Sequence, residues 1–206
     1  RTGNKSTFES DYSSLSINFT RNYNSQQNRL DRNIGILWRH SYSARLALNP
    51  TATPPIIFAE RSDGKTVFFK FNGGQWIGDG DISDKLIEVP GNGWQLITAD
   101  DTIEIYNTSG KLLSITNHDG RTQTLGYDVN GRLSTVTDDT GRALSFTYDS
   151  ASRIKTMTDP AGGIYQYTYD AAGNLASVTY PDGKIRTYHY NESAYTSGAN
   201  LPYALT

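Results

Sequence analysis

The stretch YDVNGRLSTVTDDTGRALSFTYD, residues 127–149, begins and ends with the dipeptide Tyr-Asp. Tyrosine recurs at a constant step of 21 residues, and so does glycine. The tyrosines are Tyr106, Tyr127, Tyr148, Tyr169 and Tyr190, and the glycines are Gly120, Gly141, Gly162 and Gly183. Apolar and threonine columns keep the same step, at Leu112, Leu133, Ile154 and Leu175, at Ile115, Val136, Met157 and Val178, and at Thr116, Thr137, Thr158 and Thr179. Several columns with one period identify a repeat protein.

One repeat contains two alternating runs, residues 132–137 and 142–148, and each run follows a turn signal. Val, Thr, Phe and Tyr favour strands. Asn-Gly and Asp-Gly favour the positive backbone dihedrals of tight hairpins, because glycine adopts them without steric cost and asparagine at little cost. Such pairs occur at Asn130-Gly131, Asp119-Gly120 and Asp182-Gly183. The sequence therefore predicts two antiparallel strands in each repeat.

Alternation assigns side chains to faces. Leu144, Phe146 and Tyr148 are two residues apart and share one face of the second strand. The next two repeats give Tyr165, Tyr167 and Tyr169, then Arg186, Tyr188 and Tyr190. We expect these side chains to form an aromatic ladder through cross-strand pairing. In the first strand Leu133 and Val136 are three residues apart, which requires either a β-bulge or two half-buried faces.

The regular register covers residues 106–190 and divides the chain into sections. The four units are 106–126, 127–147, 148–168 and 169–189. Upstream, Asp63-Gly-Lys65 followed by Val67, Phe69 and Phe71 copies the second half of a repeat, so degenerate repeats are expected at 59–105. Residues 191–206 begin the next unit or form a tail.

Residues 1–58 form a pre-repeat segment of different character. Leu15, Ile17, Phe19 and Arg21 alternate, which predicts one strand over residues 12–23, and a strand pair is expected within residues 34–47. No apolar helical period persists over about eleven residues anywhere. The fold class predicted is all-β, an antiparallel β-meander of 21-residue, two-stranded repeats that forms a curved, open sheet.

Composition excludes several classes of partner. The 206 residues carry 19 basic and 21 acidic side chains, a net charge of −2, so no basic field is offered to nucleic acid or an anionic membrane. There is no cysteine for disulfides or thiolate metal sites. No run of about 18 apolar residues could span a bilayer. We therefore expect neither nucleic-acid binding nor membrane insertion.

Metal and cofactor sites are not predicted. The histidines are far apart in sequence and lack a second ligand at metal-site spacing; they are His40, His118 and His189. The acidic stretch 78–84 offers four oxygen ligands for calcium but lacks the bidentate glutamate of a calcium loop. These residues are Asp79, Asp81, Ser83 and Asp84. An acidic turn is the simpler interpretation, and no cofactor is expected.

The recurring acids Asp128, Asp149 and Asp170 resemble a row of catalytic groups. A catalytic pair needs two carboxyls in different environments, whereas a repeated column has the same environment each time. Hydrogen bonds that initiate turns explain these residues better. There is no Gly-x-Ser-x-Gly nucleophile motif, and the glycines at 73 and 74 precede no helix that could hold a phosphate. The chain is predicted to have no catalytic residues and not to be an enzyme.

The repeat unit resembles a known family. YDVNGRL with DDTGR, and YDAAGNL with YPDGK, are similar to the YD repeats of the rearrangement-hotspot (RHS) proteins. FTRNYNS at 19–25 and GILWRHSYS at 35–43 resemble the segment that precedes those repeats in bacterial members, written Gly-x-Gly-Trp-Arg-His-Ser-Tyr. Leu37 stands where that pattern has its second glycine, so we expect a different turn there.

The resemblance implies a β-ribbon that winds into a hollow shell. In bacteria such shells are commonly part of secreted polymorphic toxins and enclose a C-terminal effector, and in animals they occur in cell-surface teneurins. A secreted or cell-surface location and a cargo of the same full-length chain are therefore expected. The self-cleavage core of some bacterial members has no match in this sequence, so its residues are not carried over.

Two further expectations follow from the repeat. An adhesive or carbohydrate-binding module that uses the aromatic row or the turns is the alternative function. Four regular repeats form only a strip of sheet, whose last strand near residues 186–190 would leave an open edge. We expect the chain either to self-associate through a terminal strand or to leave residues after about 190 without order.

Overall fold

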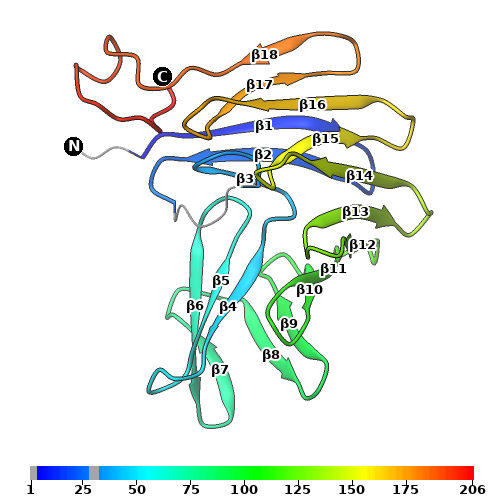
Figure 1. Cartoon of the computed structure of the whole chain (residues 1–206). Helices are drawn as coiled ribbons and strands as arrows, with labels where there is room; N and C mark the ends of the chain where they lie inside the picture. The colour runs from blue at the N-terminus through cyan, green and yellow to red at the C-terminus, as the bar shows by residue number, and fades with distance from the viewer. Residues whose placement is uncertain (1–3, 28–32) are drawn as a thin grey trace.

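The computed structural model of the chain describes residues 4–27 and 33–206. In these ranges the regular elements are all β-strands, β1 to β18, which confirms the all-β prediction. Neither range contains a helix that is long and apolar enough to cross a membrane. The strands form two antiparallel sheets, one of three strands and one of 15 (Figure 1).

The smaller sheet, here called the N-terminal sheet, consists of β1 (Ser6–Ser13), β2 (Asn18–Asn24) and β3 (Trp38–His40). A turn separates β1 from β2, where the Ser14 amide donates to the Ile17 carbonyl at 3.0 Å. The prediction of one strand over 12–23 is wrong, because this turn leaves Leu15 84% exposed. The alternation was right for β2, whose Phe19, Arg21 and Tyr23 are all buried.

The larger sheet is a meander in which every strand pairs with its neighbours in sequence, from β4 to β18. Its first part, here called the lower lobe, comprises β4 (Arg45–Asn49), β5 (Ile56–Glu60), β6 (Thr66–Asn72), β7 (Gln75–Gly78), β8 (Lys85–Val89) and β9 (Gly93–Ile97). The prediction of a strand pair within 34–47 needs correction: β3 and β4 lie there but belong to different sheets.

The remaining strands form the repeat sheet. They are β10 (Ile103–Tyr106), β11 (Leu112–Thr116), β12 (Thr122–Tyr127), β13 (Leu133–Asp138), β14 (Ala143–Tyr148), β15 (Ile154–Thr158), β16 (Ile164–Tyr169), β17 (Leu175–Thr179) and β18 (Ile185–Thr187). The large sheet touches itself where Arg45 of β4 bridges Lys111 and the Leu46 amide donates to the Gly110 carbonyl at 2.8 Å. It does not close into a barrel, so the sheet is open as predicted.

A β-bulge in every repeat settles the alternative left open by the sequence. Tyr127 pairs with Leu133 while Gly126 pairs with Thr135, so Ser134 is an additional residue on its strand. Such a residue shifts the alternation by one position. The residues inserted in this way are Leu113, Ser134, Lys155 and Ala176, at the same 21-residue step. Because of the bulge, both Leu133 and Val136 point into the core.

The turns of the Tyr-Asp column have a common geometry. The Gly131 amide donates to the Asp128 carbonyl at 2.8 Å, and the Asp128 amide donates to the Arg132 carbonyl at 2.9 Å. This is the three-residue hairpin loop whose last residue is left-handed. Gly131 has φ of 75°, whereas Asn130 is not among the positive-φ residues, so the expected positive dihedral holds only for the glycine. Ser152 takes the glycine position in the next repeat, with φ of 60°.

The predicted aromatic ladder is wrong in one respect. Phe146 pairs with Met157, Met157 pairs in turn with Tyr165, and Tyr167 pairs with Val178. An aliphatic strand therefore separates successive aromatic strands. The predicted faces are correct: in β14 the side chains at 144 and 146 are buried, while those at 145 and 147 are exposed.

Part of the core lies between the N-terminal sheet and the repeat sheet. The Phe19 ring of β2 packs against the ring of Phe146 in β14, with centroids 5.4 Å apart. The opposite face of the repeat sheet is polar: the hydroxyls of Thr147 and Thr156, for example, lie 2.6 Å apart. The repeat sheet is thus a wall with one polar face and one apolar face, and the N-terminal sheet covers the apolar one.

Residues 191–206 have a defined structure, so of the two alternatives expected for this end of the chain the lack of order is wrong, and self-association stays a prediction. Tyr190 forms an antiparallel bridge with Leu205, and the Thr206 amide donates to the His189 carbonyl at 2.9 Å. The segment folds back beside β18 and the N-terminal sheet (Figure 1).

Candidate functional site at the junction of the two sheets

From Tyr127 onward, each repeat is tied to the one before it by the hydroxyl of its Tyr-Asp tyrosine. The Tyr148 hydroxyl donates to the Leu133 carbonyl at 2.7 Å, across 15 residues of sequence. Leu133 stands next to the bulge residue Ser134. The same bond recurs with Tyr127 to Leu112 at 2.5 Å, Tyr169 to Ile154 at 2.7 Å and Tyr190 to Leu175 at 2.9 Å. This repeated bond, here called the tyrosine latch, uses a backbone acceptor beside the irregular pairing of the bulge.

A cation covers the ring of each of the first three latches. The Arg132 guanidinium lies 4.5 Å from the Tyr148 ring centroid, and Arg153 lies 4.2 Å from that of Tyr169. Lys111 does the same over Tyr127, at 4.6 Å. Contacts of this kind are favourable by about 0.5–2 kcal/mol, depending on exposure.

The junction of the two sheets contains a buried ion pair. Asp11 is the bulge residue of β1, since Ser10 pairs with Thr20 and Tyr12 with Phe19. Its two carboxylate oxygens accept hydrogen bonds from the Arg21 guanidinium at 2.7 and 2.8 Å. Both side chains are completely buried. A buried pair of this kind is costly to desolvate, and removal of either partner leaves an uncompensated charge.

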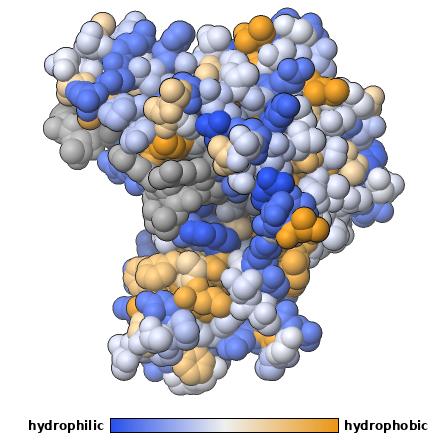
Figure 2. All heavy atoms as spheres, in the orientation of Figure 1, coloured by the Kyte–Doolittle hydropathy of each residue, from blue (hydrophilic) through white to orange (hydrophobic). Residues whose placement is uncertain are grey.

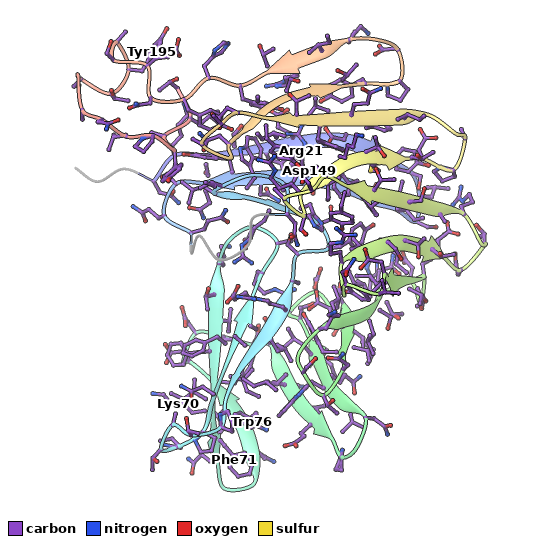
Figure 3. All side chains as sticks on the ribbon, in the orientation of Figure 1. Arg21, Lys70, Phe71, Trp76, Asp149 and Tyr195 are labelled. Carbon is purple, nitrogen blue, oxygen red and sulfur yellow. The ribbon has the colours of Figure 1, made fainter. Side chains whose placement is uncertain are left out.

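Tyrosines of the repeat sheet complete this network. Tyr167 and Tyr180 donate to the Asp11 carboxylate at 2.9 and 3.2 Å, and the Arg21 guanidinium donates to the Tyr188 hydroxyl at 2.9 Å. Together with Asp11 and Arg21, these three tyrosines are here called the hub (Figure 3 labels Arg21). The hub joins strands that are far apart in sequence through charge-assisted hydrogen bonds.

Burial and charge act together on the hub. Burial disfavours the charged guanidinium, yet the hydrogen bonds and charge of Asp11 hold the pKa of Arg21 above its ordinary value. Burial, reinforced by the Asp11 charge, raises the pKa of Tyr180 to about 12 and that of Tyr167 well above its ordinary value. The rings of Trp38 and Tyr188 lie 5.3 and 5.4 Å from the Arg21 guanidinium carbon. The cation is therefore held by a carboxylate and two aromatic rings.

The segment before β3 crosses the turns of the repeat sheet. The Ile154 amide donates to the Asn33 carbonyl at 2.7 Å, and the Ile36 amide donates to the Gly173 carbonyl at 3.2 Å. A β-carbon at Gly35 would lie 2.7 Å from the Leu175 nitrogen, so this approach requires glycine. Leu37 has φ of 63° with its side chain buried. Leu37 therefore adopts the left-handed backbone that favours glycine, and the expectation of a different turn stays a prediction.

Further ion pairs link the N-terminal segment to the lower lobe. The Glu60 carboxylate accepts from Arg39 at 2.9 Å and from Arg45 at 2.9 and 3.0 Å. Burial opposes ionisation of Glu60, but the two arginines lower its pKa below the ordinary value. Arg61 forms a bidentate pair with Glu104 at 2.5 and 2.7 Å. These pairs fix β4, β5 and β10 relative to β3.

The three histidines lie in separate environments. His40 is buried and stacks on Phe19, with ring centroids 5.3 Å apart, and its Nδ1 accepts from the Tyr42 amide. His118 is exposed and lies 3.1 Å from Asp119. His189 is exposed beside Tyr190.

The acidic stretch at 78–84 is a turn in which the Ile82 amide donates to the Asp79 carbonyl at 2.9 Å. Asp84 accepts from the Ala99 amide at 3.0 Å. Within residues 4–27 and 33–206, no three His, Cys, Asp or Glu side chains are grouped so as to hold a metal ion.

The recurring aspartates cap turns, as expected from the sequence. Asp128 accepts from the Asn130 and Arg132 amides at 2.9 Å each and from the Arg132 guanidinium at 2.8 Å. Asp149 has the same contacts, and Asp170 accepts from the Asn174 amide. The Arg132 amide and guanidinium hold the pKa of Asp128 below its ordinary value.

A cavity of about 670 Å³ lies between β4 and the turns after β10 and β12, and three cations line it. Arg45 is paired with Glu60, Arg132 with Asp128, and the Lys111 ammonium donates to the Gly131 carbonyl at 2.9 Å. Each cation thus has an acceptor within the protein. The cavity does not resemble an anion site.

The hub was not predicted from the sequence, although one signal pointed to it. Arg21 stands at an inward position of an alternating strand, between Phe19 and Tyr23. A charge on an apolar face requires a partner. The partner could not be identified, because Asp11 reaches the hub only through a bulge.

Comparison with protein families identifies the chain. A family model described as the teneurin YD-shell matches residues 88–199, which is more than half of the chain. The chain belongs to the teneurin YD-shell family. It is an RHS-type YD-repeat protein, and its role is that of a structural section of a β-shell. A second model, described as a domain of unknown function (DUF6531), matches residues 1–69.

Similarity to individual proteins is distant. No curated protein matches the chain. A crystal structure of TcdB2-TccC3-Cdc42 is 16% identical over 92% of this chain, with a TM-score of 0.36. A structure of the Photorhabdus luminescens Tc holotoxin pore is 17% identical over 92%, with a TM-score of 0.34. This chain spans 10% of the length of each, and both similarities are too distant to extend the argument.

Proposed function

We propose that this chain forms a section of wall and one closed end of a hollow β-shell that encloses a cargo polypeptide of the same full-length protein. The observation that carries the proposal is the double layer at the junction, where the N-terminal sheet covers the apolar face of a repeating wall. Exclusion of proteases and solvent from a cargo is the task that such a wall can perform.

The wall has the properties that exclusion requires. Its strands pair continuously from β4 to β18, so backbone groups within the sheet are satisfied by neighbouring strands. The tyrosine latches recur beside the Tyr-Asp turns and tie each unit to the unit before it. Nearest-neighbour contacts of this kind allow a wall to extend by addition of units.

The N-terminal sheet serves as the closure in this proposal. It is fastened to the wall by the hub, by the crossing of residues 33–37 over the turns, and by the bond from Trp38 Nε1 to the Tyr190 hydroxyl at 2.8 Å. A seal needs fixed orientation, and a buried ion pair with three tyrosine partners accepts few alternative arrangements.

The proposal also includes the division of the chain into sections, its location and the lack of chemical sites. The division into a pre-repeat segment at 1–58, degenerate repeats at 59–105, regular repeats at 106–190 and a final section at 191–206 belongs to it. So do a secreted or cell-surface location and the lack of catalytic, cofactor-binding and metal-binding residues. The outer edge of β18 pairs with the next section of wall, or with a second copy when it is left open.

The test uses the complete protein that contains this chain. Its cargo segment is exposed to proteinase K within the native protein and, in parallel, as a separately produced polypeptide. We expect the enclosed segment to persist at protease concentrations that degrade the separate one. Equal cleavage rates would reject enclosure.

Two variants connect protection to the junction. Asp11→Ala leaves Arg21 buried without its carboxylate, so the seal should loosen and the cargo should be cleaved faster. Ser145→Ala lies on the polar face of β14, away from the junction, and serves as the matched control. Protection that is unchanged in Asp11→Ala would show that the N-terminal sheet does not close the shell.

The alternative of an adhesive or carbohydrate-binding module loses its main support. Phe146, Tyr165 and Tyr167 are 4–7% exposed and packed against the core, so the aromatic row offers no binding face. An apolar groove of about 300 Å³ does occur in the lower lobe, where Phe71 and Trp76 contribute to its lining. Figure 2 shows apolar side chains gathered on this lobe, and Figure 3 labels both residues. The wall function does not use this groove.

A further inference from the structure

The segment after Tyr190 is a fifth repeat whose turn has been enlarged. The Asp170 amide donates to the Asn174 carbonyl at 3.0 Å, and the Asn191 amide donates to the Ala204 carbonyl at 3.0 Å. Likewise Tyr169 pairs with Leu175, and Tyr190 with Leu205. Ala204 follows Asn174 by 30 residues instead of 21, so the turn contains nine additional residues.

The enlarged turn, residues 192–203, is braced at its base. The Asn191 side-chain oxygen accepts from the Leu201 amide at 2.6 Å, and its side-chain nitrogen donates to Asn200 at 2.9 Å. The Glu192 carboxylate accepts from the Thr206 hydroxyl at 2.7 Å. The tip points away from both sheets, with Tyr195 75% exposed (Figure 3).

The C-terminal end of the enlarged turn is hydrogen-bonded to the N-terminal sheet. The buried Tyr23 of β2 donates its hydroxyl proton to the Tyr203 carbonyl at 2.8 Å, and the same oxygen accepts from the Leu205 amide at 3.1 Å. The Lys5 ammonium donates to the Leu205 carbonyl at 2.7 Å. Three hydrogen bonds thus connect Tyr203 and Leu205 with Tyr23 of β2 and with Lys5, which precedes β1, across 180 to 200 residues of sequence.

The fourth repeat is altered to receive this turn. Lys111, Arg132 and Arg153 precede the leucine column by one residue, and Asn174 takes that place in the fourth repeat. Asn174 is 1% exposed and its side-chain nitrogen donates to Asp170 at 2.9 Å and to the Pro202 carbonyl at 3.0 Å. The departure from the column and the enlarged turn therefore belong to one arrangement.

We infer that residues 192–203 are a clasp, an insertion in the fifth YD turn that fastens the N-terminal sheet to the wall. The tyrosine latches connect neighbouring repeats, whereas the clasp connects the fifth repeat to β2. Opening of the clasp removes this fastening, so that the N-terminal sheet is held only by the hub, the crossing at residues 33–37 and the bond from Trp38 to Tyr190, while the pairing of β11 to β16 is unchanged. This inference does not depend on whether a cargo is enclosed.

The experiment cuts the clasp after folding. A recognition sequence for a site-specific protease replaces residues 193–199 at the exposed tip, and hydrogen–deuterium exchange is measured before and after cleavage. We expect amides of β2 and β3 to exchange at least about tenfold faster in the cut protein, since three hydrogen bonds lose their covalent anchor. Amides of β13 to β16 should keep their rates.

A matched control carries the same recognition sequence after Gly80, in a lower-lobe loop outside the junction. Its cleavage should leave exchange in β2 and β3 unchanged. A second variant, Tyr23→Phe, removes the hydroxyl without any cut and should accelerate exchange in the same two strands. Unchanged exchange in β2 and β3 after the clasp is cut would overturn the inference, and so would an equal acceleration throughout the repeat sheet.

Discussion

The regular repeats and the junction are built from the same residue types but differ in the reach of their contacts. In the repeats, aspartate caps span four residues and tyrosine latches span 15. At the junction, Tyr167 and Tyr188 meet Asp11 and Arg21 across 156 and 167 residues. A tyrosine hydroxyl therefore holds neighbouring units in one region and distant parts of the chain in the other.

The difference predicts two kinds of response to mutation. A latch or cap has copies elsewhere, so its loss weakens one unit, as in repeat proteins with nearest-neighbour energetics. The hub has no copy among residues 4–27 and 33–206, and its charges are completely buried. Damage there should affect the whole docking of the N-terminal sheet.

The largest effect is expected for Asp11→Ala. The Arg21 guanidinium would remain buried without a carboxylate, which costs about 3–5 kcal/mol of unfolding free energy. We expect the N-terminal sheet to detach at a denaturant concentration that leaves the repeats folded. The ring centroids of Trp38 and Tyr188 are 5.2 Å apart, so detachment should change the fluorescence of Trp38. This change should come at a lower denaturant concentration than the loss of the repeats seen by circular dichroism.

The matched comparison is Arg142→Ala in the repeats. Arg142 is also paired with an aspartate, Asp138, but its side chain is 44% exposed. Exposed pairs contribute less than about 1 kcal/mol. If Arg142→Ala destabilised the protein as much as Asp11→Ala, the distinction between the two regions would fail.

The strands and turns of the repeats could be predicted from the sequence, and the contacts of the junction could not. Two-strand units, faces and the capping role of Asp128 follow from short-range patterns that recur at one period. Register shifts were harder: the bulge at Ser134 was one of two alternatives, and the bulge that turns Asp11 inward left no periodic trace.

The remaining errors have similar physical causes. The turn at 14–17 was missed because Leu15 continues an alternation although it is exposed. The clasp was missed because its bonds use the backbone carbonyls of residues 202, 203 and 205, which any sequence would supply. Contacts made by backbone groups leave no signal in the residue types.

A second prediction tests a turn of the repeats. Gly141 has φ of 84°, and a β-carbon there would meet nothing within 4 Å. Gly141→Val should therefore cost more than about 1 kcal/mol through backbone strain alone. Ser145→Ala, on the exposed face nearby, should cost less. Equal midpoints of thermal unfolding for Gly141→Val and the parent would contradict the account of the turn.

A third prediction isolates one latch. Tyr148→Phe removes the hydroxyl that donates to the Leu133 carbonyl, and should cost about 0.5–1.5 kcal/mol in urea unfolding. The N-terminal sheet should stay docked, with Trp38 fluorescence unchanged until global unfolding. Tyr165→Phe is the control, since Tyr165 lies on the neighbouring strand pair and is not part of a latch. If Tyr165→Phe lowered the free energy of unfolding and Tyr148→Phe did not, the assignment of the latch to Tyr148 would be wrong.

The smallest effect on stability is expected from a change of pH, which protonates the aspartates that cap the turns. The Asp138 carboxylate loses hydration on folding, but bonds from the Thr140 hydroxyl and from the Arg142 amide and guanidinium lower its pKa to about 2. The unfolded chain has an ordinary aspartate pKa of about 3.9. Because the folded value is the lower one, the cap stabilises fully above that ordinary pKa and is lost as pH falls towards about 2.

The measurement is the urea midpoint of the parent and of Asp138→Asn between about pH 6 and pH 2. Asparagine cannot supply the carboxylate at any pH, so the variant should be less stable at about pH 6 and the two midpoints should converge as pH falls. Asp128 and Asp149, whose pKa values are also lowered, add to the decline shared by both proteins. A constant difference between the two midpoints over the whole range would mean that the ionised cap contributes nothing. The bonds of Asp138 would then only follow the turn that Gly141 imposes.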